Sequence, residues 1–286
     1  MPTIAIAEPL RINTIVWIHS LEKAEMGPTR RILDDLLDLG YRGGLPVREF
    51  AIANRVELFE LLDSLATQAA QGLRPILRFD AHGNSDDGLH LSPANEWASW
   101  AELIERLRAI NVATENNLVV VFALCCGLHL YKLISLKEAT PAYLFAASEG
   151  VIDVGFLEDE THAFYKQVHE AGAFLDPFNA TLGKKMDLMN CQGLFLKALA
   201  AYIETQCRGE VLKARIERSV AAMLKRDGIS QPEAELVEKY RQRARAFLEP
   251  SEKLIDCFAP NFLIGREPGF TYADVERVAR LAPGSA

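Results

Sequence analysis

Over its first 172 residues the chain alternates short apolar runs with amphipathic segments, and this alternation constrains the fold more than any other feature. Five apolar runs are predicted to be buried strands: 13–19, 47–51, 75–82, 118–124 and 143–147. Four segments have helical spacing: 29–39, 58–70, 99–108 and 159–171. Strands that alternate with helices form a mostly parallel sheet covered by helices on both faces. We therefore predict an α/β core over residues 1–172.

Local signals mark where several of these helices begin and end. Asn54 and Glu57 have the spacing of a helix cap, and Ser99 with Glu102 forms a capping-box pattern. Gly172 closes the last amphipathic segment of the core. These signals indicate helices directly after residues 54 and 99.

From about residue 173 the pattern changes to one helix after another. Apolar spacing close to 3.6 residues is found over 186–207, 210–226, 233–248 and 272–281. We predict that residues 173–286 form an all-helical extension, packed on or beside the core.

Composition excludes several classes of function. The net charge is −8, and the 31 lysines and arginines are scattered, so we expect no nucleic-acid partner. No apolar run approaches the 18 to 20 or so residues that span a bilayer, so we expect no membrane insertion. The N-terminus lacks the pattern of a secretory signal, and five cysteines do not form a disulfide framework. A cytoplasmic location is expected, with Cys191, Cys207 and Cys257 as small buried apolar residues.

Two motifs carry the chemistry, and each closes an apolar run. The first is residues 78–83, with the sequence RFDAHG, and the second is residues 121–127, with the sequence VFALCCG. The carboxyl ends of neighbouring parallel strands are where α/β folds place their functional groups. An imidazole there can accept a thiol proton, so His82 is predicted to be the base for a cysteine nucleophile.

The second motif offers two thiols. A small residue two positions after the nucleophile favours Cys125, because Gly127 stands there, whereas Leu128 stands two positions after Cys126. Cys125 is the preferred nucleophile and Cys126 the alternative. The N–H groups of Gly83 and Cys125 are predicted to form an oxyanion hole.

The arrangement resembles the caspase-like (clan CD) cysteine peptidases, in which His-Gly ends one strand and a cysteine segment ends the next. It is most similar to the CHAT branch, which includes bacterial proteases. Residues 88–92 and 161–165 add to the likeness, which covers about residues 12–172. The resemblance implies a caspase-like sheet and a cysteine endopeptidase that cleaves specific proteins through an acyl-enzyme, without metal or cofactor. It also implies a regulatory partner and a role in bacterial defence or cell death.

The resemblance does not carry over a cleavage preference. In relatives, the residue two positions before the nucleophile helps to set the specificity pocket, and here it is Ala123. Acidic residues near the expected groove would instead attract a basic side chain: Asp80, Asp86, Asp87, Glu149 and Asp153.

Three other interpretations stay open. A non-catalytic relative would act as a binding or scaffold protein through its helical half. A nucleotide-binding protein would share the strand-helix alternation, but no phosphate-binding glycine motif follows any predicted strand. A metal site would need Cys125, Cys126 and His129, with His82 as a fourth ligand.

Overall fold

The computed structural model describes residues 10–41 and 44–281, and a mostly parallel sheet forms the centre of this part of the chain. The strand order is β2-β1-β3-β6-β7-β8, and the small strands β4 and β5 extend from β3. The strands are β1 (Thr14–Ser20), β2 (Val47–Ala51), β3 (Pro75–Asn84), β4 (Gly88–Leu91), β5 (Glu96–Ala98), β6 (Val119–Ala123), β7 (Leu144–Ala147) and β8 (Asp187–Asn190).

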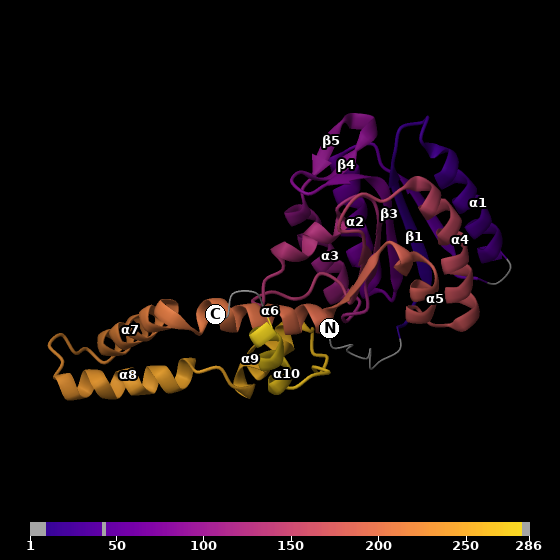
Figure 1. The fold of residues 1–286 in the computed structure, drawn as a ribbon. Helices are drawn as coiled ribbons and strands as arrows, with labels where there is room; N and C mark the ends of the chain where they lie inside the picture. The colour runs from indigo at the N-terminus through magenta and orange to yellow at the C-terminus, as the bar shows by residue number, and fades with distance from the viewer. Residues whose placement is uncertain (1–9, 42–43, 282–286) are drawn as a thin grey trace.

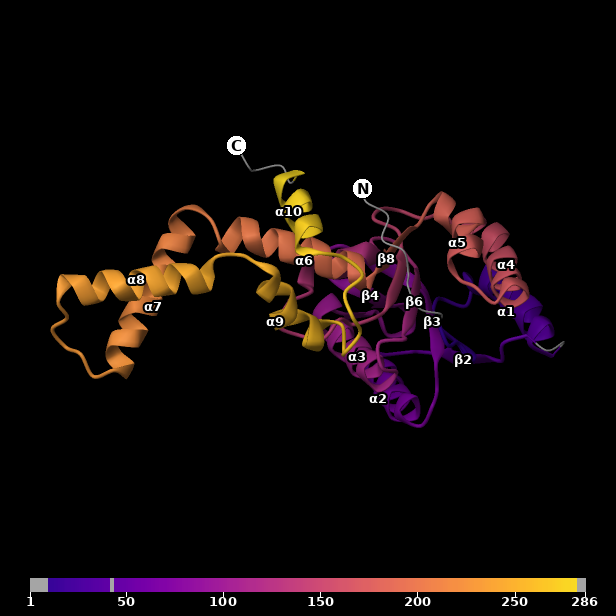
Figure 2. The same ribbon diagram turned by 90° about the horizontal axis from the view of Figure 1, so that it is seen from below.

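Helices cover both faces of this sheet, as Figures 1 and 2 show. On one face lie α1 (Met26–Tyr41), α4 (Val154–Ala171) and α5 (Leu175–Ala180), and on the other α2 (Arg55–Ala70) and α3 (Trp100–Ala113). The predicted caps are confirmed, because the side chains of Asn54 and Ser99 accept the N–H groups of Glu57 and Glu102. The expectation of a mostly parallel sheet between helices is confirmed.

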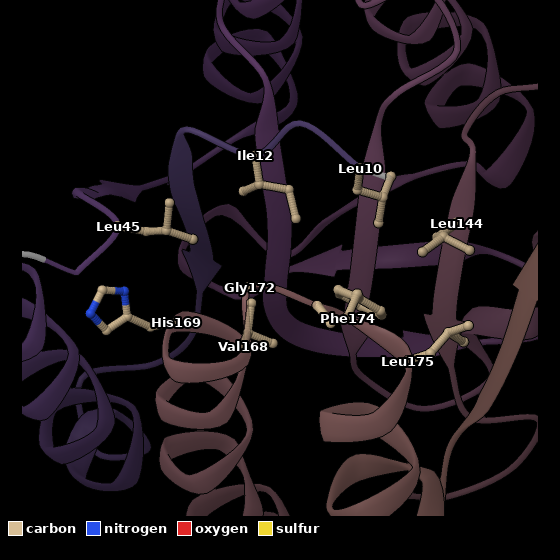
Figure 3. A pocket seen from close by; sticks show the side chains of 10 residues that line it. Leu10, Ile12, Leu45, Leu144, Val168, His169, Gly172, Phe174 and Leu175 are labelled. Carbon is tan, nitrogen blue, oxygen red and sulfur yellow. The ribbon is translucent and has the colours of Figure 1, made fainter. Parts of the chain in front are cut away.

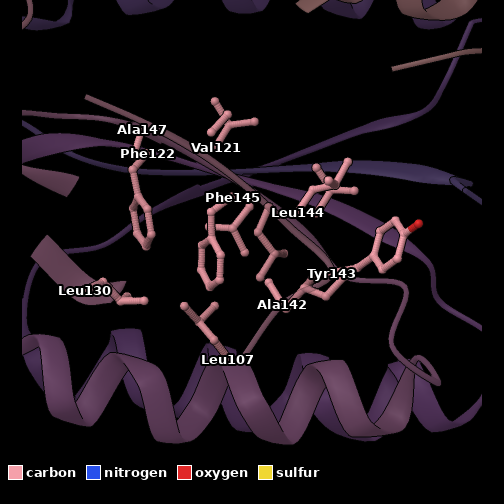
Figure 4. Packing of buried hydrophobic residues seen from close by; sticks show 14 of the residues in the cluster. Leu107, Val121, Phe122, Leu130, Ala142, Tyr143, Leu144, Phe145 and Ala147 are labelled. Atoms are coloured by element: carbon pink, nitrogen blue, oxygen red, sulfur yellow. The ribbon is translucent and has the colours of Figure 1, made fainter. Parts of the chain in front are cut away.

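The sheet core is apolar on both faces in its centre. All residues of β6 and β7 are buried. The rings of Phe79 and Phe122 stack with their centroids 5.1 Å apart. Figure 4 shows Leu107 of α3 pointing toward side chains of these strands, Phe122 and Phe145 among them. A strand buried on both sides reads as a continuous apolar run, which explains why these strands are visible in the sequence.

Three strands were not expected. The hairpin of β4 and β5 continues β3 beyond the main sheet, and β8 pairs antiparallel with β7. The prediction of a helix over 186–207 is wrong at its beginning, because the helix starts only at Cys191, after β8. Leu188 and Met189 favour helices locally, but pairing with β7 overrides that weak preference. The extension is therefore not all-helical.

The remaining helices follow β8. They are α6 (Cys191–Gln206), α7 (Gly209–Arg226), α8 (Ala234–Leu248), α9 (Glu252–Phe262) and α10 (Tyr272–Leu281). Three short 3₁₀ helices lie in loops before β8: η1 (Ser92–Ala94), η2 (Gly127–Leu133) and η3 (Leu182–Lys184). The helices α5 and α9 were missed, since each contains a proline, Pro177 and Pro260. Among the described residues, no helix combines the length and the apolar character needed to cross a bilayer.

Part of the helical region belongs to the core. The buried side chain of Asn116, just before β6, donates to the Leu263 carbonyl at 2.9 Å, and the Thr140 amide donates to the Phe262 carbonyl at 2.9 Å. The rings of Phe195 and Phe262 stack beside them, with their centroids 5.1 Å apart. The division at residue 172 stays a prediction, but β8, α6 and α9 lie beyond it and pack with the sheet.

The hairpin of α7 and α8, which we call the arm, projects away from the body in both ribbon views (Figures 1 and 2). Its buried residues Ile216, Val220 and Ala244 form a hydrophobic cluster separate from the main core. The arm therefore holds itself together largely through contacts between its own two helices.

Candidate active site

The two chemical motifs meet at one edge of the sheet. Strands β3 and β6 are parallel neighbours, and Asp80 pairs with Ala123. The pairing of β3 with β6 ends at Asp80 and its pairing with β1 ends at Ala81. His82 therefore lies just beyond the main sheet, although β3 itself continues to Asn84 as one side of the β4 hairpin.

His82 and Cys125 line the same cavity, which has a volume of about 340 Å³. Most of its wall is apolar and comes from the beginning of α1, from β3 and β6, and from residues 152–157. Its polar lining residues are Glu25, Thr29, Arg78, Asp80, His82 and Cys125. The structure thus brings together a thiol, an imidazole and two carboxylates around an otherwise apolar hollow.

Glu25 is the residue of this site that the sequence did not reveal. Its Oε1 atom lies 2.8 Å from Nε2 of His82. Partial burial raises the pKa of Glu25. The hydrogen bonds with His82 and with the backbone of Glu22 lower the pKa by more than burial raises it, so it lies below its usual value. The residues after each parallel strand gather at one sheet edge, and Glu25 follows β1 closely, which is the signal that could have found it.

This contact fixes the role of the His82 ring. An ionised carboxylate can only accept a hydrogen bond, so Nε2 of His82 donates to Glu25. Among the described residues, Nδ1 of His82 has no hydrogen-bond partner. Nδ1 is therefore the ring nitrogen that remains open to another contact.

Gly83 allows the two motifs to approach closely. A Cβ atom at this position would lie 2.8 Å from the Cys125 carbonyl oxygen and 2.7 Å from Cδ1 of Leu124. Both distances are shorter than van der Waals contact, so a side chain at Gly83 would push the segment that follows β6 away. The glycine after the histidine is needed for the spacing of the site.

The structure treats the two adjacent cysteines differently. Cys125 lines the cavity and Cys126 does not. Cys126 has a left-handed backbone with φ 60°, donates its N–H to the Gly150 carbonyl at 3.0 Å, and caps η2. Within the described residues, the Cys125 N–H has no hydrogen-bond partner and is available to a ligand. Of the two thiols, Cys125 is therefore the one that belongs to the cavity lining.

Of the other predicted groove residues, only Asp80 and Ala123 line the cavity. Asp86 and Asp87 are exposed in the turn after β3, where Asn84 accepts both of their N–H groups. Glu149 is exposed in the loop after β7.

Asp153 caps α4 by accepting the Phe156 N–H at 2.7 Å, and it pairs with Lys185. The hydrogen bond from Lys185 and that from Phe156 hold the pKa of Asp153 below its usual value. Asp153 therefore has a structural role at the helix end, outside the cavity lining.

The other described histidines and cysteines lie outside the cavity lining. His19 is buried in β1, with Nε2 3.0 Å from Glu49, and does not line the cavity. In residues 10–41 and 44–281, no three His, Cys, Asp or Glu side chains are grouped as metal ligands. Cys191 and Cys207 are buried as predicted, but the prediction for Cys257 is wrong, because it is exposed on α9.

A second cavity of about 360 Å³ lies at the opposite end of the sheet (Figure 3). It is lined by Ile12 before β1, Leu144 at the start of β7, and the end of α4 around Val168. His169 is the titratable residue of its described lining. No thiol or carboxylate of the described chain lines it, so the cavity at His82 is the better candidate for chemistry.

A comparison with models of known protein families and with curated proteins found no match for this chain.

Proposed function

We propose that this protein is a cysteine endopeptidase of the caspase-like, CHAT type, with Cys125 as the nucleophile and His82 as the base. One observation carries the proposal: the two residues lie just beyond the parallel pairing of β3 with β6 and line one cavity, with Glu25 hydrogen-bonded to Nε2 of His82. A carboxylate that orients a histidine beside a thiol is the arrangement that activates cysteine nucleophiles.

The chemistry follows from these positions. Nδ1 of His82 takes the Sγ proton, and the Cys125 thiolate adds to the carbonyl carbon of the scissile bond. The oxyanion accepts hydrogen bonds from the N–H groups of Cys125 and Gly83. The C–N bond breaks as the leaving amine takes the proton from His82, which leaves a thioester. Water, deprotonated by His82, then attacks the thioester, and the carboxylic acid leaves as the thiol is restored.

The cavity and the exposure of His82 and Cys125 determine how a substrate can bind. His82 and Cys125 line the same cavity, and no hydrogen bond joins them within the described chain. Both residues are partly exposed, with 53% of the His82 side chain accessible. An extended peptide can therefore reach the dyad without opening the core.

Cleavage of a diverse peptide library, read by mass spectrometry, tests the proposal. We expect His82→Ala and Cys125→Ala to lower the cleavage rate by about 1,000-fold or more, because each removes a partner of one proton transfer. The Cys126→Ala variant is the matched control and should still cleave the peptides. Loss of cutting in the Cys126 variant alone would move the nucleophile to that residue.

A second function, partner binding without catalysis, is favoured by the arm. Phe247 on α8 is 86% exposed, which is unusual for a large aromatic side chain. The two functions are separated by a thiol-reactive peptide probe. Labelling of Cys125 that depends on His82 supports the peptidase, and labelling no faster than that of exposed Cys257 supports the binding protein.

A further inference from the structure

We propose that the cavity beside Cys125 holds the side chain of the residue whose carbonyl is attacked, and that this residue is lysine or arginine. The inference rests on the proposed peptidase function. It arises from the position and the incomplete hydrogen bonding of Asp80, which forms part of the cavity wall.

Asp80 lies below the reactive pair on the same face of the sheet. Residues two apart on a strand share a face and lie about 7 Å apart, so Asp80 is one such step deeper than His82. Its partner on β6 is Ala123, whose small side chain leaves the space next to the carboxylate open. The register therefore places a carboxylate beside a vacant volume, below the nucleophile.

The carboxylate of Asp80 is only partly satisfied. Asp80 is 9% exposed, and its Oδ2 accepts the Thr29 hydroxyl at 2.6 Å. Its other oxygen has no hydrogen-bond partner among the residues that the structure describes, and no cation lies within ion-pair distance of it there. A buried carboxylate in this state binds a charged donor strongly.

Arg78 lies two residues before Asp80 on β3, and it does not satisfy the free oxygen of the Asp80 carboxylate. Its guanidinium carbon lies 4.3 Å from the centre of the Trp17 ring, and its side chain is fully buried. Its nitrogens are buried and have no hydrogen-bond partner in the described chain.

The apolar part of the cavity lining suits the stem of a basic side chain. Ile32 of α1 and Leu157 of α4 line the cavity. Lysine and arginine have long aliphatic stems that pack on apolar surface while the charged end reaches a polar partner. At the rim, Glu25 adds a second negative charge. An acidic substrate side chain would meet both carboxylates.

Irreversible peptidyl acyloxymethyl ketones, which alkylate an active-site thiol, test this inference on the full chain. Four probes differ only at the residue next to the reactive group: lysine, arginine, leucine or glutamate. The labelling rate of Cys125 is read by mass spectrometry. We expect the basic probes to react about tenfold or more faster than the leucine probe, and the glutamate probe to be slowest.

Two variants test whether Asp80 causes the preference for a basic side chain. Asp80→Asn, which keeps the shape, should lower the lysine-to-leucine rate ratio by about tenfold, and Ala123→Leu should lower it by filling the adjacent space. Asp35→Asn, an exposed carboxylate of α1 outside the cavity, is the matched control and should keep the ratio. The preference of the unaltered chain is measured first, so the result does not depend on how a variant folds.

The outcomes separate the two proposals. Faster reaction of the leucine or glutamate probe, or a basic preference that survives in Asp80→Asn, would overturn the cavity assignment and leave the peptidase intact. Labelling of Cys125 by no probe above the rate of exposed Cys257 would overturn the peptidase itself, and the cavity assignment with it.

Discussion

Glu25 and His82 are joined by a 2.8 Å contact between Oε1 and Nε2, although 57 positions separate them in the chain. Glu25 comes from the loop between β1 and α1, and His82 from β3. The pair therefore links two parts of the sheet edge around the cavity. It converts the Cys-His pair that the sequence suggests into a Cys-His-Glu arrangement.

Glu25→Gln should lower kcat/KM for peptide cleavage by about tenfold to 100-fold, because the amide no longer holds the proton on Nε2 or stabilises the charged ring. Glu22→Gln is the matched control, since only the backbone of Glu22 contacts Glu25. Steady-state kinetics with one peptide measures both. A rate for Glu25→Gln equal to that of the control would remove Glu25 from the mechanism.

Stability should depend on pH through the same carboxylate. The pKa of Glu25 is lowered in the folded protein, because its hydrogen bonds with His82 and Glu22 outweigh the effect of burial. Its contribution to the free energy of unfolding is therefore present above the unfolded pKa of about 4.3 and is lost as pH falls through the lower folded value. Urea unfolding between pH 3 and 7 should show the difference between the native chain and Glu25→Gln shrinking only in the acidic range.

Gly83→Ala should reduce both stability and cleavage. The new methyl group would lie 2.8 Å from the Cys125 carbonyl oxygen, so the loop that carries Cys125 must move. We expect a loss of about 1–3 kcal/mol in the free energy of unfolding, measured by urea titration. Gly150→Ala is the control, because a Cβ at Gly150 meets no atom within 4 Å. Equal stability of the two variants would contradict the close approach.

The thiols should differ in their reaction with iodoacetamide at pH 8. Burial raises the pKa of Cys191 to about 11, and burial also raises that of Cys207. Cys125, Cys126 and Cys257 are partly or fully exposed and should be alkylated in the native protein. Cys191 and Cys207 should react only after unfolding. Native-state labelling of Cys191 at the rate of Cys257 would show that this part of the core opens.

Asn116→Ala should loosen the helices that follow β8 from the core. The Asn116 amide donates to the Leu263 carbonyl at 2.9 Å and accepts from Asn111 at 3.0 Å, all in buried surroundings. Leaving these groups unpaired costs about 1–3 kcal/mol in the free energy of unfolding. Asn179→Ala, at an exposed position, should be neutral. Thermal unfolding followed by circular dichroism compares the two.

The sequence predicted the parts of the fold that depend on local pattern. The buried runs at β6 and β7 and the caps at Asn54 and Ser99 have signals within a few residues. Strand β8 has no such signal, because Leu188 and Met189 favour a helix until β7 is present to pair with them. Sheet pairing over a long sequence distance is decided by tertiary contacts.

The candidate site also has residues that the sequence predicted and residues that it did not. His82 and Cys125 stand at the ends of recognisable strands, so their proximity follows from parallel pairing. Glu25 lies in a short loop of charged and small residues without a pattern, and its role appears only when α1 folds against the sheet. Asp80 was named among five acidic residues, and only the strand register and the cavity distinguish it from the other four.

The separate hydrophobic cluster of the arm has a consequence for motion. Because Ile216, Val220 and Ala244 do not share the main core, α7 and α8 can open without breaking the sheet. Hydrogen exchange should then resolve two cooperative units, a fast one over the arm and a slow one over β1, β3 and β6. A molecule that binds the arm would slow hydrogen exchange in the arm and leave exchange in the sheet unchanged.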